Sequence, residues 1–167
     1  PAGISLHGGV RRNTEYCILC HNPNLTDESR RLARGGEMPP ESLHYKYLIH
    51  SLHMGEEREV ATRFGTRANT ENVFFPTPGE QRNCAKCHEG LSYTLPLPAG
   101  VLPTTVTQAG KVISVTQPIA SACRACHIGQ TGFDAHADTM TSAKYGEACA
   151  NCHARDKELA VEKVHKR

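Results

Sequence analysis

Hydrophobic residues occur along the chain in short clusters, and no apolar run is long enough to form a membrane-spanning helix. The pattern therefore predicts short elements separated by irregular segments. Pro39-Pro40 and Gly55 are start and stop signals around residues 41–54, which we expect to form a helix. Two more stretches carry helix signals, namely residues 26–34, which Gly35-Gly36 follow, and residues 156–164.

Residues 101–117 follow a different pattern, rich in β-branched and polar residues, with Gly110 near the centre. This pattern predicts a small hairpin insertion with one strand over 101–107 and the other over 111–117. Residues 56–83 are expected to form loop. The predicted fold class is mostly irregular, with short α-helices and one small β-hairpin.

The composition shows that the chain has few hydrophobic residues from which to form a core. Only 38% of its 167 residues are hydrophobic, 5% are aromatic and there is no Trp. This length fits a single domain over residues 1–167. The net charge of +2 provides no basic stripe for a nucleic-acid partner. The first residues lack a signal-peptide pattern, so a signal peptide has been removed or is absent.

The eight cysteines form four C-x-x-C pairs, and each pair is followed directly by a histidine. The cysteines are Cys17, Cys20, Cys84, Cys87, Cys123, Cys126, Cys149 and Cys152, and the histidines are His21, His88, His127 and His153. C-x-x-C-H is the attachment signature of c-type haem. The two thiols reach the two vinyl groups of one haem, and the adjacent histidine is the proximal iron ligand. The sequence therefore predicts four covalently attached haem c groups.

Three other interpretations compete with haem, and one of them, structural disulfides between the pairs, would not explain the histidines. Zinc ribbons also use C-x-x-C pairs, but a zinc site needs no histidine directly after the second cysteine. Disulfides within such pairs are usually redox-active, and four of them in one domain would be unusual. Four haems would also supply the missing apolar surface, so we expect a multihaem cytochrome c fold organised around them, largely unfolded without them.

Six histidines remain as candidates for the distal iron position. His50 and His53 lie three residues apart on the predicted helix 41–54 and so share one face. The other candidates are His7, His136 and His165, while His44 is the weakest. Met38, Met54 and Met140 are a scarcer source of ligands. A haem with two histidine ligands has no open position, so it transfers electrons and turns over no substrate.

Several motifs resemble a known family. They are Leu6-His7-Gly8-Gly9, Arg11-Arg12, Cys17-Ile18-Leu19-Cys20-His21-Asn22-Pro23, Thr26-Asp27, Ile49-His50-Ser51-Leu52-His53-Met54-Gly55, Phe74-Phe75-Pro76 and Asn83-Cys84-Ala85-Lys86-Cys87-His88. Together they resemble the OmcA/MtrC type of extracellular multihaem cytochromes over most of the chain. The resemblance implies transfer of electrons to minerals or other extracellular acceptors. It also implies distal ligands at His7, His50, His53, His136 and His165, and no ligand role for His44.

The chain departs from this family at one point. A pentahaem domain of that type has a further C-x-x-C-H just before the segment that matches Leu6-His7-Gly8-Gly9, and this sequence has none there. Five distal histidines then face four haems. Either one of them has lost its iron, or one serves a haem of a neighbouring molecule, as in polymerised tetrahaem cytochrome filaments. A cut from a longer protein is a further explanation.

The sequence thus predicts a secreted electron-transfer protein, not an enzyme, located outside the cell or at its surface. The favoured hypothesis is a homopolymer, a filament subunit whose redox partners are other cytochromes or extracellular acceptors. The alternatives are a monomeric shuttle, periplasmic or extracellular, and a module of a larger decahaem-type cytochrome. A multihaem reductase with one open haem is the least favoured, because the spare histidines would fill that position.

Overall fold

The computed structural model of the chain describes residues 7, 9–59, 63–64, 67–68 and 80–166. Seven α-helices lie within them: α1 (Thr14–Cys20), α2 (Glu28–Ala33), α3 (Tyr45–Met54), α4 (Pro118–His127), α5 (Phe133–Thr139), α6 (Ala150–His153) and α7 (Val161–Val164). The 3-10 turns are η1 (Gly55–Glu57), η2 (Glu80–Arg82) and η3 (Cys84–Lys86). Three two-stranded antiparallel ribbons pair β1 (Arg63–Phe64) with β2 (Arg67–Ala68), β3 (Thr104–Gln108) with β4 (Lys111–Thr116), and β5 (Thr141–Ser142) with β6 (Gly146–Glu147).

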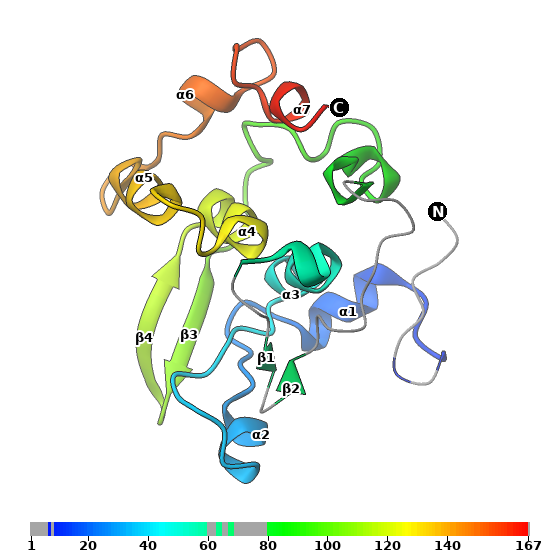
Figure 1. The fold of residues 1–167 in the computed structure, drawn as a ribbon, viewed down its shortest axis with the longest axis vertical. Coiled ribbons are helices and arrows are strands. Elements are labelled where there is room, and N and C mark those ends of the chain that lie inside the picture. The colour runs from blue at the N-terminus through cyan, green and yellow to red at the C-terminus, as the bar shows by residue number, and fades with distance from the viewer. Residues whose placement is uncertain (1–6, 8, 60–62, 65–66, 69–79, 167) are drawn as a thin grey trace.

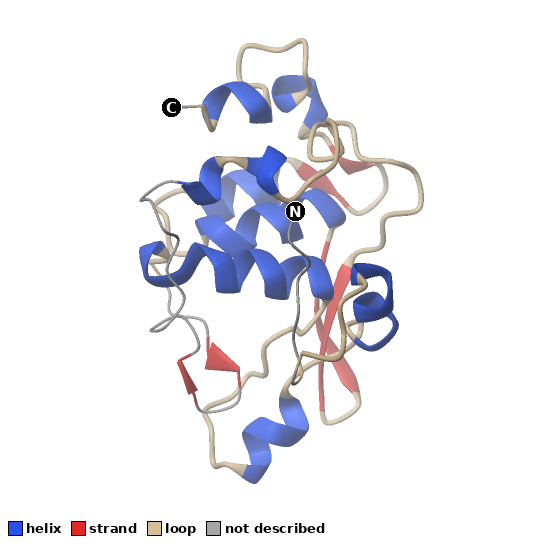
Figure 2. Cartoon of the chain, turned by 90° about the vertical axis from the view of Figure 1, so that its right-hand side faces the viewer, coloured by secondary structure: helices blue, strands red, loops and turns tan. Residues whose placement is uncertain are grey.

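Helices α3 and α4 pack against each other at the centre of the molecule, and the other elements surround them (Figures 1 and 2). Their buried residues are mostly small: Ser51 on α3, and Ala120, Ser121 and Ala125 on α4. Small side chains let two helix backbones approach closely. The buried apolar residues of the described chain are few, namely Leu48, Leu95, Ala120, Ala125, Ala137 and Ala160. The core that the protein builds from its own side chains is therefore thin, as the composition predicted.

The β3–β4 hairpin confirms the hairpin expected over residues 101–117. Its turn lies at Ala109 and Gly110, which both have positive φ. The first strand begins at Thr104, three residues later than expected, directly after Pro103, which has no N–H to give to a ladder. The hairpin is tied to the segment after the first motif, because the Thr105 N–H donates to the Pro23 carbonyl over 2.9 Å.

The helix predictions are confirmed in part. Helix α2 begins at Glu28 with Asp27 as its N-cap, inside the predicted residues 26–34. Helix α3 ends at Met54, before Gly55, as expected but begins at Tyr45, because residues 41–43 pair with residues 25–27. The helix expected over residues 156–164 is wrong for its first half, which forms turns, and only α7 is helical.

The loop expected over residues 56–83 also contains η1, η2 and the β1–β2 ribbon, and the rest of it lies outside the described residues. The short helices on or beside the cysteine motifs, α1, α4, α5 and α6, were not predicted. No helix among the described residues is long and apolar enough to cross a membrane.

A buried ion pair fixes the segment between the first motif and α3. Asp27 is 2% exposed and Arg31 is 5% exposed. The Arg31 Nη2 donates to Asp27 Oδ2 over 2.7 Å, and the Glu41 N–H donates to Asp27 Oδ1 over 2.8 Å. The hydrogen bond to Asp27 is the main cause that raises the pKa of Arg31. The Arg31 Nη1 also donates to the Glu37 carbonyl, so the network holds α2 against residues 37–41.

We expect Asp27→Ala to lower the free energy of unfolding by about 3 kcal/mol, because the buried Arg31 guanidinium would lose its nearest carboxylate and keep Glu41 at 3.6 Å. Urea unfolding of the purified protein measures this loss. The matched control is Glu89→Ala at an exposed position, which should change the stability by less than about 0.5 kcal/mol. Equal losses in the two variants would contradict a structural role for the ion pair.

Candidate functional site

Each of the four C-x-x-C-H motifs forms one helical turn. The histidine N–H donates to the carbonyl of the first cysteine in three of them: His21 to Cys17 over 2.8 Å, His88 to Cys84 over 2.9 Å and His153 to Cys149 over 2.9 Å. The third motif forms the end of α4. A turn of this kind gathers the two thiols and the imidazole, so each motif is arranged for attachment to one flat group.

Each motif histidine has the ring of one histidine from another part of the chain close to its own. The four ring pairs, with their centroid separations, are His7–His21 at 6.1 Å, His50–His88 at 6.1 Å, His127–His165 at 5.9 Å and His136–His153 at 6.2 Å. Each pair thus joins one predicted proximal residue to one predicted distal residue. The sequence could not assign these pairs, because the partners lie between 14 and 38 positions apart in either chain direction.

The spacing of the four pairs fits a haem iron between the rings. With metal–imidazole bonds of about 2.0–2.1 Å, two imidazoles on opposite sides of one ion have ring centroids about 6 Å apart. None of the eight cysteines forms a disulfide, so both attachment points of every motif are available. Among the described residues, no group of three or more His, Cys, Asp or Glu is placed to hold a metal ion.

Hydrogen bonds at Nδ1 orient several of these rings. The Nδ1 atoms of His21, His153 and His165 lie 2.9, 2.8 and 2.9 Å from the carbonyls of Leu43, Leu159 and Val161. A carbonyl only accepts, so Nδ1 carries the proton there and the lone pair lies on Nε2. This is the tautomer that presents Nε2 to a metal, with the Nδ1 bond fixing the ring.

His50 is also held in the ligand form. Burial lowers its pKa to about 4, with smaller contributions from His88 and His53 in the same direction. The imidazole is therefore neutral near pH 7, as a metal ligand must be. His53, the remaining member of the five predicted distal ligands, lies one turn further along α3, and its Nδ1 donates to the Ile49 carbonyl over 2.8 Å.

His44 has a polar environment that links three elements. Its Nδ1 lies 2.7 Å from Thr104 Oγ1 on β3, and that oxygen lies 2.6 Å from Ser121 Oγ on α4. His44 is also the N-cap residue of α3. Burial, with a smaller effect of the Lys46 charge, lowers the pKa of His44 to about 4. These contacts give His44 a place in the packing of α3, β3 and α4.

Two contacts of α3 bring the first three motifs together. The Tyr45 N–H donates to the His21 carbonyl of the first motif over 2.9 Å. The Cys126 thiol of the third motif lies 3.7 Å from the carbonyl of His50, whose ring pairs with the second motif. Burial, with smaller contributions from neighbouring thiols, raises the pKa of Tyr45.

Two charged groups that the sequence did not single out position the third and fourth motifs. The Glu147 carboxylate accepts hydrogen bonds from the Ile119 and Ala120 N–H groups, over 2.8 and 2.6 Å, and so caps the start of α4. Arg124, inside the third motif, pairs with Asp134 and Asp138 on α5 at 2.7 Å each. Helix α5 carries His136, so this pairing holds the ring that faces His153.

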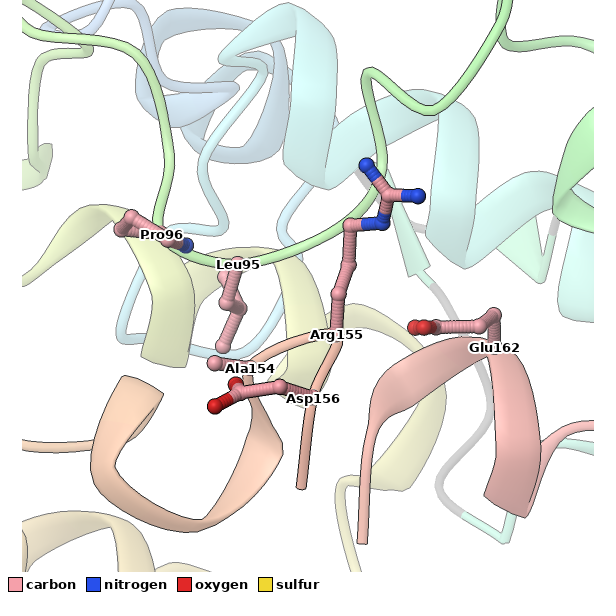
Figure 3. Close-up of a pocket in the computed structure, with 6 residues that line it drawn as sticks. All are labelled: Leu95, Pro96, Ala154, Arg155, Asp156 and Glu162. Carbon is pink, nitrogen blue, oxygen red and sulfur yellow. The ribbon is translucent and has the colours of Figure 1, made fainter. Parts of the chain in front are cut away.

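A pocket of about 520 Å³ opens beside the fourth motif and is drawn in Figure 3. Its apolar wall is formed by Leu95, Pro96 and Ala154, and its charged residues are Arg155, Asp156 and Glu162. Ala154 directly follows His153, and Glu162 lies on α7 three residues before His165. The apolar wall suits a porphyrin ring, and Arg155 could pair with an anionic propionate, whereas Asp156 and Glu162 would repel one.

Pairs of histidine rings about 6 Å apart, each pair with one histidine from a C-x-x-C-H motif, are the arrangement of a c-type cytochrome. Residues 2–166 match the family model of the outer membrane cytochromes described as MtrC/MtrF-like, domains II/IV, and the chain belongs to that family. No curated protein and no solved structure matches the chain. Membership confirms the resemblance to the MtrC type, implies covalently bound haem c and electron transport, and indicates an extracellular or cell-surface location.

The ring pairs generate a spectroscopic prediction. In the haem-loaded protein, His165→Ala should leave the His127 side as the single axial ligand, so one haem should change from low spin to high spin. His7→Ala, His50→Ala and His136→Ala should each do the same for one other haem. Electron paramagnetic resonance of the oxidised protein measures the high-spin fraction.

His44→Ala is the matched control for these variants, because its ring lies beside Thr104 and faces no motif histidine among the described pairs. We expect this variant to lose stability but to keep the low-spin spectrum. A high-spin signal in His44→Ala, or its absence in His165→Ala, would contradict the ligand assignment.

Proposed function

We propose that this chain is a tetrahaem c-type cytochrome unit that carries electrons outside the cytoplasm, through four haems each held between two histidines. The observation that carries the proposal is the set of four ring pairs, each with one motif histidine and a centroid separation of 5.9–6.2 Å. Family membership supports the same class of function.

In this proposal the eight motif cysteines form the thioether bonds, and the side chains at both axial positions come from the protein. The proximal residues are His21, His88, His127 and His153, and their distal partners are His7, His50, His165 and His136. When bound, haem c supplies a one-electron couple at each site. Because the protein fills both axial positions, no substrate can coordinate, and we propose an electron-transfer protein and not an enzyme.

The protein's own contribution is to keep neighbouring sites close. Helix α3 carries His50, which belongs to the second site, and the His50 carbonyl lies 3.7 Å from the Cys126 thiol of the third motif. The Tyr45 N–H, at the start of the same helix, donates to the His21 carbonyl of the first motif over 2.9 Å. A single helix thereby contacts three of the four sites and keeps them close, so that electrons would pass between them. Other cytochromes and extracellular acceptors are the redox partners in this proposal.

The haem count tests the proposal. We expect the pyridine haemochrome assay to give four haems per chain, with a low-spin spectrum in the oxidised state. Fewer than four haems, or a full complement that includes a high-spin haem in the unmodified protein, would overturn it. The second of these results would favour the reductase hypothesis.

A filament subunit is the second candidate function, and the argument for it is the number of candidate distal histidines compared with the number of C-x-x-C-H motifs. Five histidines match distal positions of the family, whereas the chain has four C-x-x-C-H motifs. One of the five would then serve a haem outside this segment. That haem would belong to a neighbouring copy in a filament, or to a longer chain in a decahaem-type module.

Negative-stain electron microscopy of the haem-loaded protein tests this second candidate. Long thin filaments that His44→Ala preserves are the expected result for a polymer. Discrete particles at all protein concentrations would reject the filament and leave the monomeric shuttle or the module of a larger cytochrome.

A further inference from the structure

The side chain of Gln130 contacts the imidazole of His127, the histidine of the third motif. Its Oε1 lies 2.6 Å from His127 Nδ1. If His127 Nε2 is to present its lone pair to a metal, Nδ1 must carry the proton, so the ring donates this hydrogen bond and the amide oxygen accepts it. The contact is therefore a short hydrogen bond at the ring nitrogen that does not bind the proposed iron.

The loop between α4 and α5 holds this amide in place. The Gln130 N–H donates to the His127 carbonyl over 3.2 Å, and the Phe133 N–H donates to the Gln130 carbonyl over 3.0 Å. Gly129 and Gly132 both have positive φ, so the chain turns sharply before and after Gln130. The Phe133 ring stacks on the His127 ring, with centroids 5.3 Å apart and an interplanar angle of 22°. One short loop thus fixes both the ring and its acceptor.

The other motif histidines have different acceptors at Nδ1. The Nδ1 atoms of His21 and His153 lie 2.9 and 2.8 Å from backbone carbonyls. The Nδ1 of His88 lies 3.3 Å from the Ser92 hydroxyl, which is longer than an ordinary N–H···O hydrogen bond. Of the Nδ1 contacts described for the four motif histidines, that of His127 is therefore the shortest, and its acceptor is a side chain that a substitution can change.

Hydrogen bonding at Nδ1 changes the strength of an imidazole as a metal ligand. An acceptor draws the N–H proton away from the ring, so the ring donates more electron density through Nε2. Stronger donation stabilises the oxidised metal, which carries one more positive charge than the reduced metal. The bond from His127 to Gln130 is part-buried, so water competes with it less than at an exposed site. This bond therefore favours the oxidised state at the third site.

We propose that Gln130 is a positioning residue that lowers the reduction potential of the haem at the third motif, by accepting the hydrogen bond from His127. Reduction adds one electron at that site and transfers no atom or proton, so the charge there falls by one. The inference rests on the proposed function, because it requires a haem at this motif. Ser92, whose contact with His88 is longer, should influence the second haem much less.

A spectroelectrochemical titration of the haem-loaded protein tests the inference with Gln130→Leu and Gln130→Glu. Leucine offers no acceptor, whereas glutamate offers a stronger one in the same shape. Ser92→Ala is the matched comparison, since it removes a contact at the same nitrogen of another motif histidine. The third and second haems are identified in separate His165→Met and His50→Met variants, because a methionine axial ligand raises the potential.

In Gln130→Leu we expect the ratio of reduced to oxidised third haem, at a fixed potential, to rise about tenfold. A tenfold change corresponds to a shift of 59 mV for a one-electron couple. Gln130→Glu should shift the same haem in the opposite direction. Ser92→Ala should change the ratio for the second haem by less than about twofold, because the 3.3 Å contact is too long for a strong hydrogen bond.

Shifts of the same sign in Gln130→Leu and Gln130→Glu would overturn the inference, because the residue would then act through packing and not as an acceptor. An unchanged potential of the third haem in Gln130→Leu would overturn it as well. If Gln130→Leu lost this haem, Gln130→Glu would decide, and a potential that is not lowered there would reject the inference. The proposed function fails separately, when the unmodified protein itself holds fewer than four haems.

Discussion

Two imidazoles that hold one iron must face each other with ring centres about 6 Å apart, and the rest of this structure depends on that spacing. Four histidine pairs have ring centroids 5.9–6.2 Å apart, and in each the two rings come from different parts of the chain. A fold that satisfies this constraint four times in 167 residues leaves little chain for regular elements. This explains the short helices and two-stranded ribbons, and the few buried apolar side chains.

The central helix pair, α3 and α4, brings the second and third motifs together with few residues. Helix α3 presents His50 to the second motif and lies against α4, which contains the third motif. Serines and alanines at the buried faces of α3 and α4 keep the two backbones close. Larger residues there would separate the second site from the third, so the small residues set the distance between redox sites. The polar chain from His44 through Thr104 to Ser121 fixes the same packing from one end.

The sequence predicted which residues belong to the attachment motifs better than it predicted which histidines pair in three dimensions. The C-x-x-C-H motifs are local, so the attachment residues and proximal histidines could be named directly. The hairpin and the end of α3 were also predictable, because glycine and β-branched residues act locally. The pairing of His165 with His127 and of His7 with His21 was not, since it depends on contacts between distant segments. The start of α3 was predicted too early because pairing of residues 41–43 with 25–27 is a tertiary interaction.

Haem attachment constrains the cysteines and the histidine of a C-x-x-C-H motif but leaves the two intervening residues free. In the third motif both of these residues hold the surrounding scaffold. Arg124 forms ion pairs with two aspartates of α5, the helix that carries His136. The Ala125 carbonyl accepts a hydrogen bond from the buried guanidinium of Arg58. The two residues between the cysteines of the third motif thus bind neighbouring elements of the fold. The four motifs of this chain are therefore not interchangeable, even though their attachment chemistry is identical.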